Sequence, residues 1–236
     1  MKCLTLQSYG NLVLDECTTK SIQDSQVRIS TAYAGLSFTD YIIQNGWYRY
    51  QRAYMPLPYV PGFEASGIVT EVGQHVSDIT VGDAVLVLQK YGCFSEEIVT
   101  SPENIIKVPS DIDIKWAASL PVNYFTAYHA LHNIVQVFPN SNILVESAAG
   151  GVGGMLVQLA SRNNRVTGLV GSISKCAYGE RLGAHRVYTY EDMTTTERYD
   201  VTLSASGTNI RNYQSLLAPN GKLVVYGFHT LVPNGR

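Results

Sequence analysis

The chain has 236 residues, of which 45% are hydrophobic and 15% charged, a balance typical of a packed globular protein rather than a disordered one. A net charge of −2 gives no electrostatic footprint for nucleic acid or an anionic membrane surface. No apolar run is long enough to cross a bilayer and no secretory leader follows Met1, so a cytoplasmic location is expected.

The first 120 residues consist of short apolar runs separated by glycine, proline and aspartate. This punctuation is typical of an all-β unit, in which short strands alternate with turns. The predicted strands cover residues 27–32, 65–72, 84–88, 97–100 and 105–108.

From Trp116 onward the pattern becomes helical, and a helix is predicted over 116–134. Strands and helices then alternate, which indicates a parallel, doubly wound sheet. The predicted strands are 142–147, 165–170, 186–190, 200–204 and 222–226, and the predicted helices are 153–163, 175–182 and 211–217. The fold class is therefore α/β, with a β domain at 1–120 and a nucleotide-binding domain at 121–236.

The segment 142–154, with the sequence NILVESAAGGVGG, carries the strongest functional signal. A buried strand leads through a glycine turn into an amphipathic helix. The spacing Ala148-x-Gly150-x-x-Gly153 matches the dinucleotide-binding fingerprint, with alanine in place of the first glycine. The N-terminus of such a helix directs N–H groups and a partial positive charge at a phosphate. An ordinary glycine turn is the alternative.

The end of the next strand bears on the choice of cofactor. NAD-selective sites place an acid about 20 residues beyond the fingerprint, where it binds the ribose 2′-hydroxyl. This chain has Gly171-Ser-Ile-Ser-Lys175 there and no acid. A lysine attracts the 2′-phosphate that an acid would repel, so NADP(H) is predicted. A solvated lysine in the first turn of a helix is the alternative.

Several motifs occur in order along the chain, namely GLSFTD at 35–40, GWY at 46–48, PGFEASG at 61–67, VG at 72–73, GDAV at 82–85 and AAGGVG at 148–153. With them the chain resembles the medium-chain dehydrogenase/reductase superfamily. Within it, VNYFTAY at 122–128 and Tyr226-Gly227 are similar to the zinc-free quinone oxidoreductase branch, and most to its vesicle-amine-transport-protein-like members. The resemblance implies a GroES-like β domain followed by a Rossmann domain, with NADPH in the cleft between them.

The resemblance also assigns cofactor-binding residues. For the pyrophosphate they are Ala149, Gly150, Gly151, Val152 and Gly153. For the 2′-phosphate they are Gly171, Ser172, Lys175 and Tyr190, although Tyr190 could equally be a strand residue that packs on a helix. Beside the nicotinamide they are Asn123 and Thr126, and at the cleft end of a late strand they are Tyr226, Gly227 and Phe228.

The zinc enzymes of this superfamily place a cysteine where Ser37 stands and a histidine where Phe63 precedes Glu64. Both ligands are missing, so the three protein ligands of a catalytic zinc cannot be assembled and no metal is predicted. His129 and His132 share a helix face and could hold a metal, or they are ordinary histidines. The four cysteines, at 3, 17, 93 and 176, show no paired spacing, so free or buried thiols in a reducing compartment are expected.

The nicotinamide supplies the hydride, while the protein orients it and stabilises the oxyanion that develops on the acceptor. Tyr48 is the predicted hydrogen-bond donor and proton source, and Ser37, at the family's usual asparagine position, is a weaker donor. A flat, apolar acceptor site would be lined by Trp47, Tyr48, Tyr50, Tyr54 and Tyr59. The alternative is that these aromatic side chains cover a core or an interface.

Two departures from the family are expected to matter. The connection between Tyr190 and Asp200 is short where relatives insert a helix, and the chain stops at Arg236 where relatives continue for roughly a hundred residues. A fragment or a shortened product with an incomplete Rossmann domain is therefore expected, and a homodimer only in the full-length form.

The leading functional hypothesis is an NADPH-dependent reductase of quinones or α,β-unsaturated carbonyls. A catalytically silent NADPH-binding or interaction protein is the second hypothesis, and it rests on the expected truncation and on the Ser37 substitution. A zinc alcohol dehydrogenase and a polyketide enoyl reductase domain are further alternatives.

Overall fold

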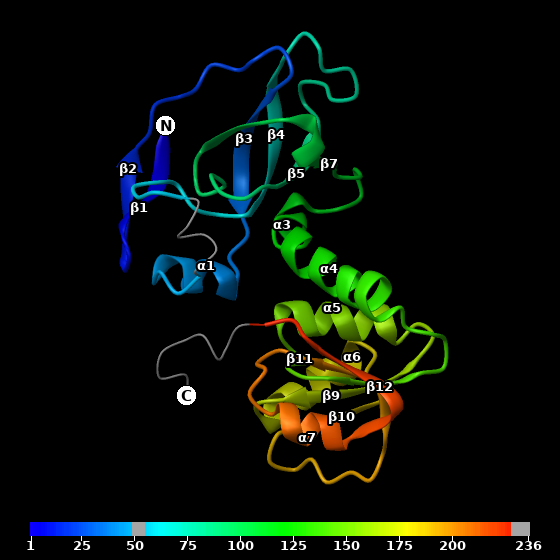
Figure 1. The fold of residues 1–236 in the computed structure, drawn as a ribbon. Helices are drawn as coiled ribbons and strands as arrows, with labels where there is room; N and C mark the ends of the chain where they lie inside the picture. The colour runs from blue at the N-terminus through cyan, green and yellow to red at the C-terminus, as the bar shows by residue number, and fades with distance from the viewer. Residues whose placement is uncertain (49–54, 228–236) are drawn as a thin grey trace. The chain divides into compact units, whose positions relative to one another are not determined.

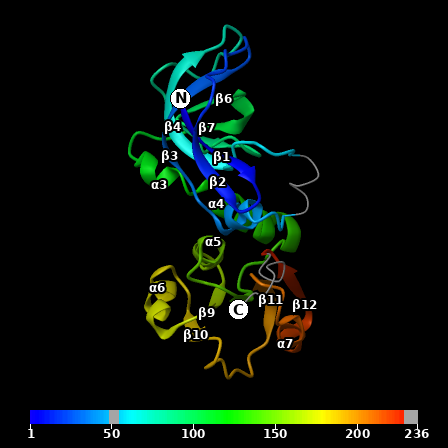
Figure 2. The same cartoon turned by 90° about the vertical axis from the view of Figure 1, so that its left-hand side faces the viewer.

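A computed structural model describes residues 1–48 and 55–227. The chain divides into two compact units, Met1–Val122 and Asn123–Arg236, which are treated one at a time (Figure 1, Figure 2). Within the described ranges, no helix combines the length and the apolar character needed to span a membrane.

The first unit is built on an antiparallel sheet with the strand order β6-β3-β4-β5-β7. Its strands are β3 (Val27–Ala34), β4 (Glu64–Val72), β5 (Ala84–Leu88), β6 (Glu97–Thr100) and β7 (Ile105–Lys107). All five predicted strands are confirmed, two of them with identical bounds. Side chains that alternate along the strands form the core, which includes Val27, Ile29, Val69 and Val85.

The first unit also holds elements that the sequence does not predict. These are the hairpin strands β1 (Lys2–Ser8) and β2 (Asn11–Glu16), the helices α1 (Phe38–Gln44) and α3 (Ile114–Ala117), and the 3-10 turn η1 (Pro102–Asn104). Gly10, at the hairpin turn, has a positive φ of 85°. Asp40 accepts a hydrogen bond from the N–H of Ser37 at 2.8 Å, which caps the start of α1.

The hairpin brings two cysteines together. β1 pairs antiparallel with β2, with Cys3 opposite Asp15, and Cys3 and Cys17 form a disulfide with their Cα atoms 6.0 Å apart. The expectation of four free thiols is therefore wrong for this pair, because the pairing follows from a hairpin register that the cysteine spacing does not reveal. Cys93 and Cys176 are free thiols.

Replacing Cys17 with serine is expected to lower the free energy of unfolding of the oxidised protein by about 2–3 kcal/mol, because the bond restricts the unfolded chain. The two cysteines are 14 residues apart. Guanidinium denaturation with and without dithiothreitol measures the effect, with Cys176→Ser as the control. Reductant should lower the stability of the wild type to that of the variant, and a wild type insensitive to reductant would contradict the prediction.

The second unit contains a parallel sheet with the strand order β10-β9-β8-β11-β12. Its strands are β8 (Asn142–Val145), β9 (Arg165–Val170), β10 (Arg186–Thr189), β11 (Tyr199–Ser204) and β12 (Leu217–Val225). The predicted parallel, doubly wound sheet is confirmed. The strand order reverses between β8 and β11, and open α/β sheets bind ligands at such a switch point.

Helices cover both faces of this sheet. They are α5 (Gly151–Ala160), the 3-10 turn η3 (Ile173–Lys175), α6 (Cys176–Arg181) and α7 (Ile210–Ser215). Successive residues of a strand point to opposite faces. Val145 therefore packs in the core with Leu156 of α5, whereas Leu144 packs with Tyr213 of α7.

Two connecting segments test the prediction further. The prediction of a single helix over 116–134 is wrong, because Pro121 cannot continue a helix from the preceding turn. Pro121 instead starts α4 (Pro121–Tyr128), which runs into the π-helical segment η2 (His129–Val135). The short connection between β10 and β11 is confirmed, since residues 190–198 contain no helix.

Candidate cofactor-binding site

The fingerprint turn links β8 to α5. Ser147 has a positive φ of 57°, and its carbonyl accepts the N–H of Gly150 at 2.8 Å. α5 starts at Gly151, two residues before the predicted start, with Gly150 as its N-cap. The first N–H groups of a helix have no partner inside the helix, so they are available to an anion in the turn.

The glycines of the turn give it the shape of a phosphate cradle. A Cβ on Gly153 would collide with the carbonyl oxygen of Ser147, and a Cβ on Gly151 would lie 2.5 Å from Oδ1 of Asn123. Gly150 and Gly151 are exposed, whereas Ala149 and Val152 are half-buried and Gly153 is buried. A phosphate can thus approach the backbone at 150–151 while Gly153 packs the helix on the turn, so these residues fit a dinucleotide pyrophosphate.

The predicted 2′-phosphate residues lie at the ends of β9 and β10. The N–H of Tyr190 donates to the carbonyl of Val170 at 3.2 Å, and a Cβ on Gly171 would lie 3.9 Å from the Tyr190 ring. Lys175 is exposed at the end of η3, and Ser172 is the residue before that turn. Tyr190 also lines a cavity of about 270 Å³ beside α7.

The remaining predicted contacts lie around β12 and α4. Tyr226 and Gly227 follow β12, and the Tyr226 hydroxyl donates to the carbonyl of Glu146 at 2.7 Å. Asn123 packs against Gly151 at the fingerprint, and Thr126 is half-buried one turn further along α4. Phe228 lies outside the described residues.

Glu146 is a residue of this site that the sequence reasoning misses. It is 3% exposed and follows β8 directly. Its carboxylate accepts hydrogen bonds from Ser204, at the end of β11, and from Ala205 and Ser206 in the loop that follows. The one sequence feature that could have identified Glu146 is its place at the end of an apolar run. A glutamate at that place is usually solvated, so the feature is not distinctive.

Three tyrosines share the surroundings of Glu146. Burial, and next the Glu146 charge, raise the pKa of Tyr190, Tyr213 and Tyr226. Their hydroxyls therefore keep their protons at neutral pH, which fits the donor role of Tyr226.

The predicted chemical residues of the first unit flank α1. The Ser37 hydroxyl donates to Oδ2 of Asp40 at 2.9 Å, so its proton is already engaged. Tyr48 is half-buried, four residues after α1 ends. Burial raises the pKa of Asp40, opposed by the hydrogen bonds from Ser37.

The structure describes three residues of the predicted aromatic cluster, Trp47, Tyr48 and Tyr59. The Trp47 ring meets the Tyr41 ring edge to face, with centroids 5.7 Å apart. The backbone of Tyr59 forms an antiparallel bridge with Leu6 of β1. Tyr50 and Tyr54 lie outside the described residues. Tyr41, an exposed residue of α1 that the sequence does not single out, also lies near Phe38, with ring centroids 5.8 Å apart.

Glu64, the first residue of β4, is a second buried acid that the sequence reasoning misses. It is 1% exposed, Oε2 accepts the N–H of Val122 at 2.7 Å, and Oε1 has no hydrogen-bond partner among the residues that the structure describes. Burial, with the Asp40 charge in the same direction and the Val122 N–H opposing, raises its pKa to about 7. A carboxyl group in this position can hold a proton near neutral pH.

The histidines considered as metal ligands have other contacts. His129 Nδ1 and Asn133 Nδ2 are joined by a hydrogen bond of 2.9 Å. The ring centroids of His132 and Tyr128 are 4.4 Å apart. Across residues 1–48 and 55–227, no three His, Cys, Asp or Glu side chains gather into a group that could hold a metal ion.

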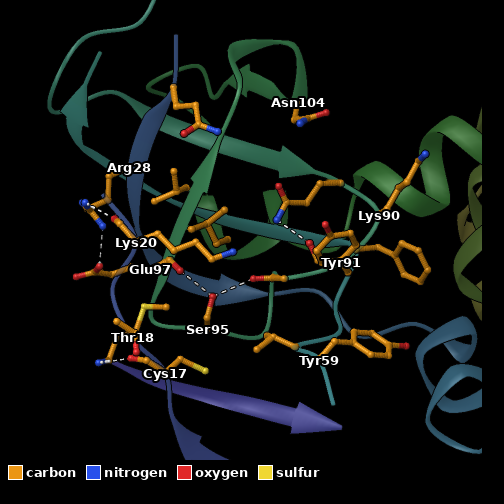
Figure 3. A pocket seen from close by; sticks show the side chains of 18 of the residues that line it. Cys17, Thr18, Lys20, Arg28, Tyr59, Lys90, Tyr91, Ser95, Glu97 and Asn104 are labelled. Atoms are coloured by element: carbon orange, nitrogen blue, oxygen red, sulfur yellow. Dashed lines mark hydrogen bonds and ion pairs between the residues drawn. The ribbon is translucent and has the colours of Figure 1, made fainter. Parts of the chain in front are cut away.

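A cavity of about 1140 Å³ lies in the first unit beside the hairpin (Figure 3). Arg28 forms an ion pair with Glu97 at 3.1 Å in its wall, and Tyr59 also lines it. Of the described members of the predicted acceptor site, Tyr59 lines this cavity, whereas Trp47 and Tyr48 do not.

Two family models match the chain, one in each unit. The alcohol dehydrogenase GroES-like domain matches residues 23–110. The zinc-binding dehydrogenase model matches residues 151–235.

Individual proteins match nearly the whole chain. Quinone oxidoreductase-like protein 2 of Bos taurus is 30% identical, over 92% of this chain and 65% of that protein. The crystal structure of human synaptic vesicle membrane protein VAT-1 homolog-like protein has a TM-score of 0.82 and 30% identity, over 95% of this chain and 72% of that one. The structure of mycobacterial Rv1454c complexed with NADPH has a TM-score of 0.87 and 25% identity. The match covers 98% of this chain and 75% of that one. The chain spans about half to two thirds of the length of the curated relatives it matches.

Proposed function

The chain belongs to the medium-chain dehydrogenase/reductase superfamily, and from that premise we propose that it is a zinc-independent, NADPH-dependent reductase that transfers a hydride to quinones or α,β-unsaturated carbonyls. The similar proteins named quinone oxidoreductases support an oxidoreductase. The observation that carries the proposal is the fingerprint turn at α5 together with the acid-free end of β9, where Gly171 and Tyr190 lie side by side.

NADP(H) is the cofactor in this proposal. The N–H groups at the start of α5 bind the pyrophosphate, which Gly150 and Gly151 allow to approach. Lys175 and Ser172 bind the 2′-phosphate through charge-assisted hydrogen bonds. The NADPH complex of the similar mycobacterial protein supports this choice of cofactor.

The bound cofactor supplies the hydride. Tyr48 donates a hydrogen bond to the acceptor oxygen and supplies a proton as negative charge develops there. Ser37 contributes less, because its hydroxyl donates to Asp40. Zinc independence rests on Ser37 and Phe63, since neither a serine hydroxyl nor a phenyl ring replaces the cysteine and histidine ligands of the zinc enzymes.

Replacing Lys175 with alanine is expected to weaken NADPH binding about tenfold and to leave NADH binding unchanged, because the variant loses its ion pair with the 2′-phosphate. Isothermal titration with both cofactors measures this. Arg162→Ala, which removes an exposed cation beyond the other end of α5, is the matched control. A wild type that binds NADH as tightly as NADPH would contradict the cofactor preference, and binding of neither would contradict the whole proposal.

A catalytically silent NADPH-binding or interaction protein is the second candidate. The Ser37–Asp40 hydrogen bond favours it, because that bond occupies the hydroxyl at the family's usual asparagine position. NADPH oxidation with a panel of quinones and enones separates the two. Turnover excludes the silent protein, whereas NADPH binding without turnover supports it.

A further inference from the structure

We propose that Glu146 is a positioning residue of the cofactor site: its carboxylate holds the 204–208 loop at the switch point of the sheet, where the loop forms one wall of the site. This inference rests on the proposed function, because it concerns the same NADP(H) site. It assigns a role to a buried charge that neither the fingerprint nor the predicted contacts use.

The position of Glu146 in the fold is the first argument. It lies between β8 and Ser147, the positive-φ residue that starts the fingerprint turn. β8 pairs with β11 in parallel, with Val145 opposite Leu203, and the strand order reverses at this pair. The Glu146 side chain therefore emerges at the carboxyl ends of the two strands that flank the switch point, where open α/β sheets bind ligands.

The contacts of the carboxylate are the second argument. Oε2 accepts hydrogen bonds from Ser204 Oγ at 2.6 Å, Ala205 N at 2.7 Å and Ser206 N at 3.1 Å, and Oε1 accepts one from Ser206 Oγ at 2.8 Å. All four donors are neutral; one is the hydroxyl of Ser204, the last residue of β11, and the other three belong to the loop that follows it. Two of them are backbone N–H groups, which would be left without this partner if the side chain were removed. The loop therefore depends on Glu146 for its shape.

Further hydrogen bonds extend this arrangement in both directions. The N–H of Glu146 donates to the Leu203 carbonyl at 2.9 Å, and its carbonyl accepts the Tyr226 hydroxyl. Within the loop, the hydroxyls of Ser206 and Thr208 are 2.7 Å apart. Glu146 thus fixes the ends of β8, β11 and β12 relative to one another.

The exposure of the loop shows which part is available to a ligand. Ala205 is buried, Ser206 and Gly207 are half-buried, and Thr208 is exposed. A ligand held at the N-terminus of α5 occupies the crevice at the switch point, and the loop after β11 borders the same crevice. Binding at the fingerprint therefore requires the loop in the position that Glu146 gives it.

Isothermal titration with NADPH tests the role. Glu146→Ala is expected to weaken binding about tenfold, because the loop loses its charged acceptor. Glu146→Gln keeps an acceptor oxygen and should retain most of the affinity. Ser206→Ala removes one of the four donors and should weaken binding about threefold. Ser215→Ala, whose hydroxyl bonds to Asn212 within α7, is the matched control and should bind like the wild type.

Thermal unfolding of each variant separates positioning from plain support of the fold. Wild-type affinity in Glu146→Ala, or in Ser206→Ala if the first variant does not fold, would overturn the proposal even if the melting temperature falls. A wild type that fails to bind NADPH would overturn the proposed function, and this inference with it. A wild type that binds while the variants bind equally well would overturn the inference alone.

Discussion

Replacing Gly153 with alanine is expected to abolish measurable NADPH binding and to destabilise the second unit by roughly 3 kcal/mol, since overpacking forces the backbone apart. The new Cβ would collide with the carbonyl oxygen of Ser147, so α5 must move away from the turn. That movement takes the N–H groups of the helix away from the phosphate. NADPH titration and thermal unfolding of the variant measure the two effects.

Gly154→Ala is the matched control for this prediction. Gly154 is the next glycine in the same helix, and a Cβ there would meet the end of the flexible Leu182 side chain at 3.1 Å. Alanine also favours a helix over glycine by about 1 kcal/mol. This variant should therefore bind NADPH and unfold much as the wild type does. Equal affinity in both variants would show that close packing at Gly153 does not shape the site.

The wild type is expected to lose about 2 kcal/mol of folding stability as the pH rises from about 5 to about 8, and replacing Glu64 with glutamine is expected to abolish this loss. The pKa of Glu64 is raised to about 7, chiefly by burial. The folded state therefore keeps a proton that the unfolded state releases above its pKa of 4.5. This contribution is fully present below that value and is lost as the pH rises through 7. Glutamine cannot ionise, so the variant escapes the loss.

Urea denaturation at about pH 5 and about pH 8 gives the free energy of unfolding of the variant and of the wild type for comparison. Glu103→Gln, which neutralises an exposed acid of the same unit, is the control and should keep the wild-type pH dependence. A Glu64→Gln variant whose stability falls with pH as steeply as that of the wild type would show that Glu64 holds no proton in the folded state.

The parts of the fold that the sequence predicts are those with a local signal. The strands of the parallel sheet are short continuous apolar runs, and the turn before α5 has its glycines at fixed spacing. β12 is found only from residue 222, because Pro219-Asn-Gly221 inside it has the composition of a turn. The hairpin β1–β2 is missed because β2 has no buried residue and burial does not alternate regularly along β1.

The parts of the site that cannot be predicted depend on partners far away in the sequence. Glu146 bonds to residues about 60 positions later, so nothing near it distinguishes it from a solvated glutamate. Glu64 becomes unusual only when Val122 and Asp40 pack against it. The disulfide depends in the same way on the hairpin register.

The chemical states of the four cysteines leave one natural attachment point for a label. Cys3 and Cys17 are bonded to each other, and burial raises the pKa of Cys93 to about 12, which suppresses its reactive thiolate. Cys176 is a free, half-buried thiol directly after Lys175. A thiol-reactive fluorophore would therefore attach beside the proposed 2′-phosphate site, and its emission would report cofactor binding without an engineered cysteine.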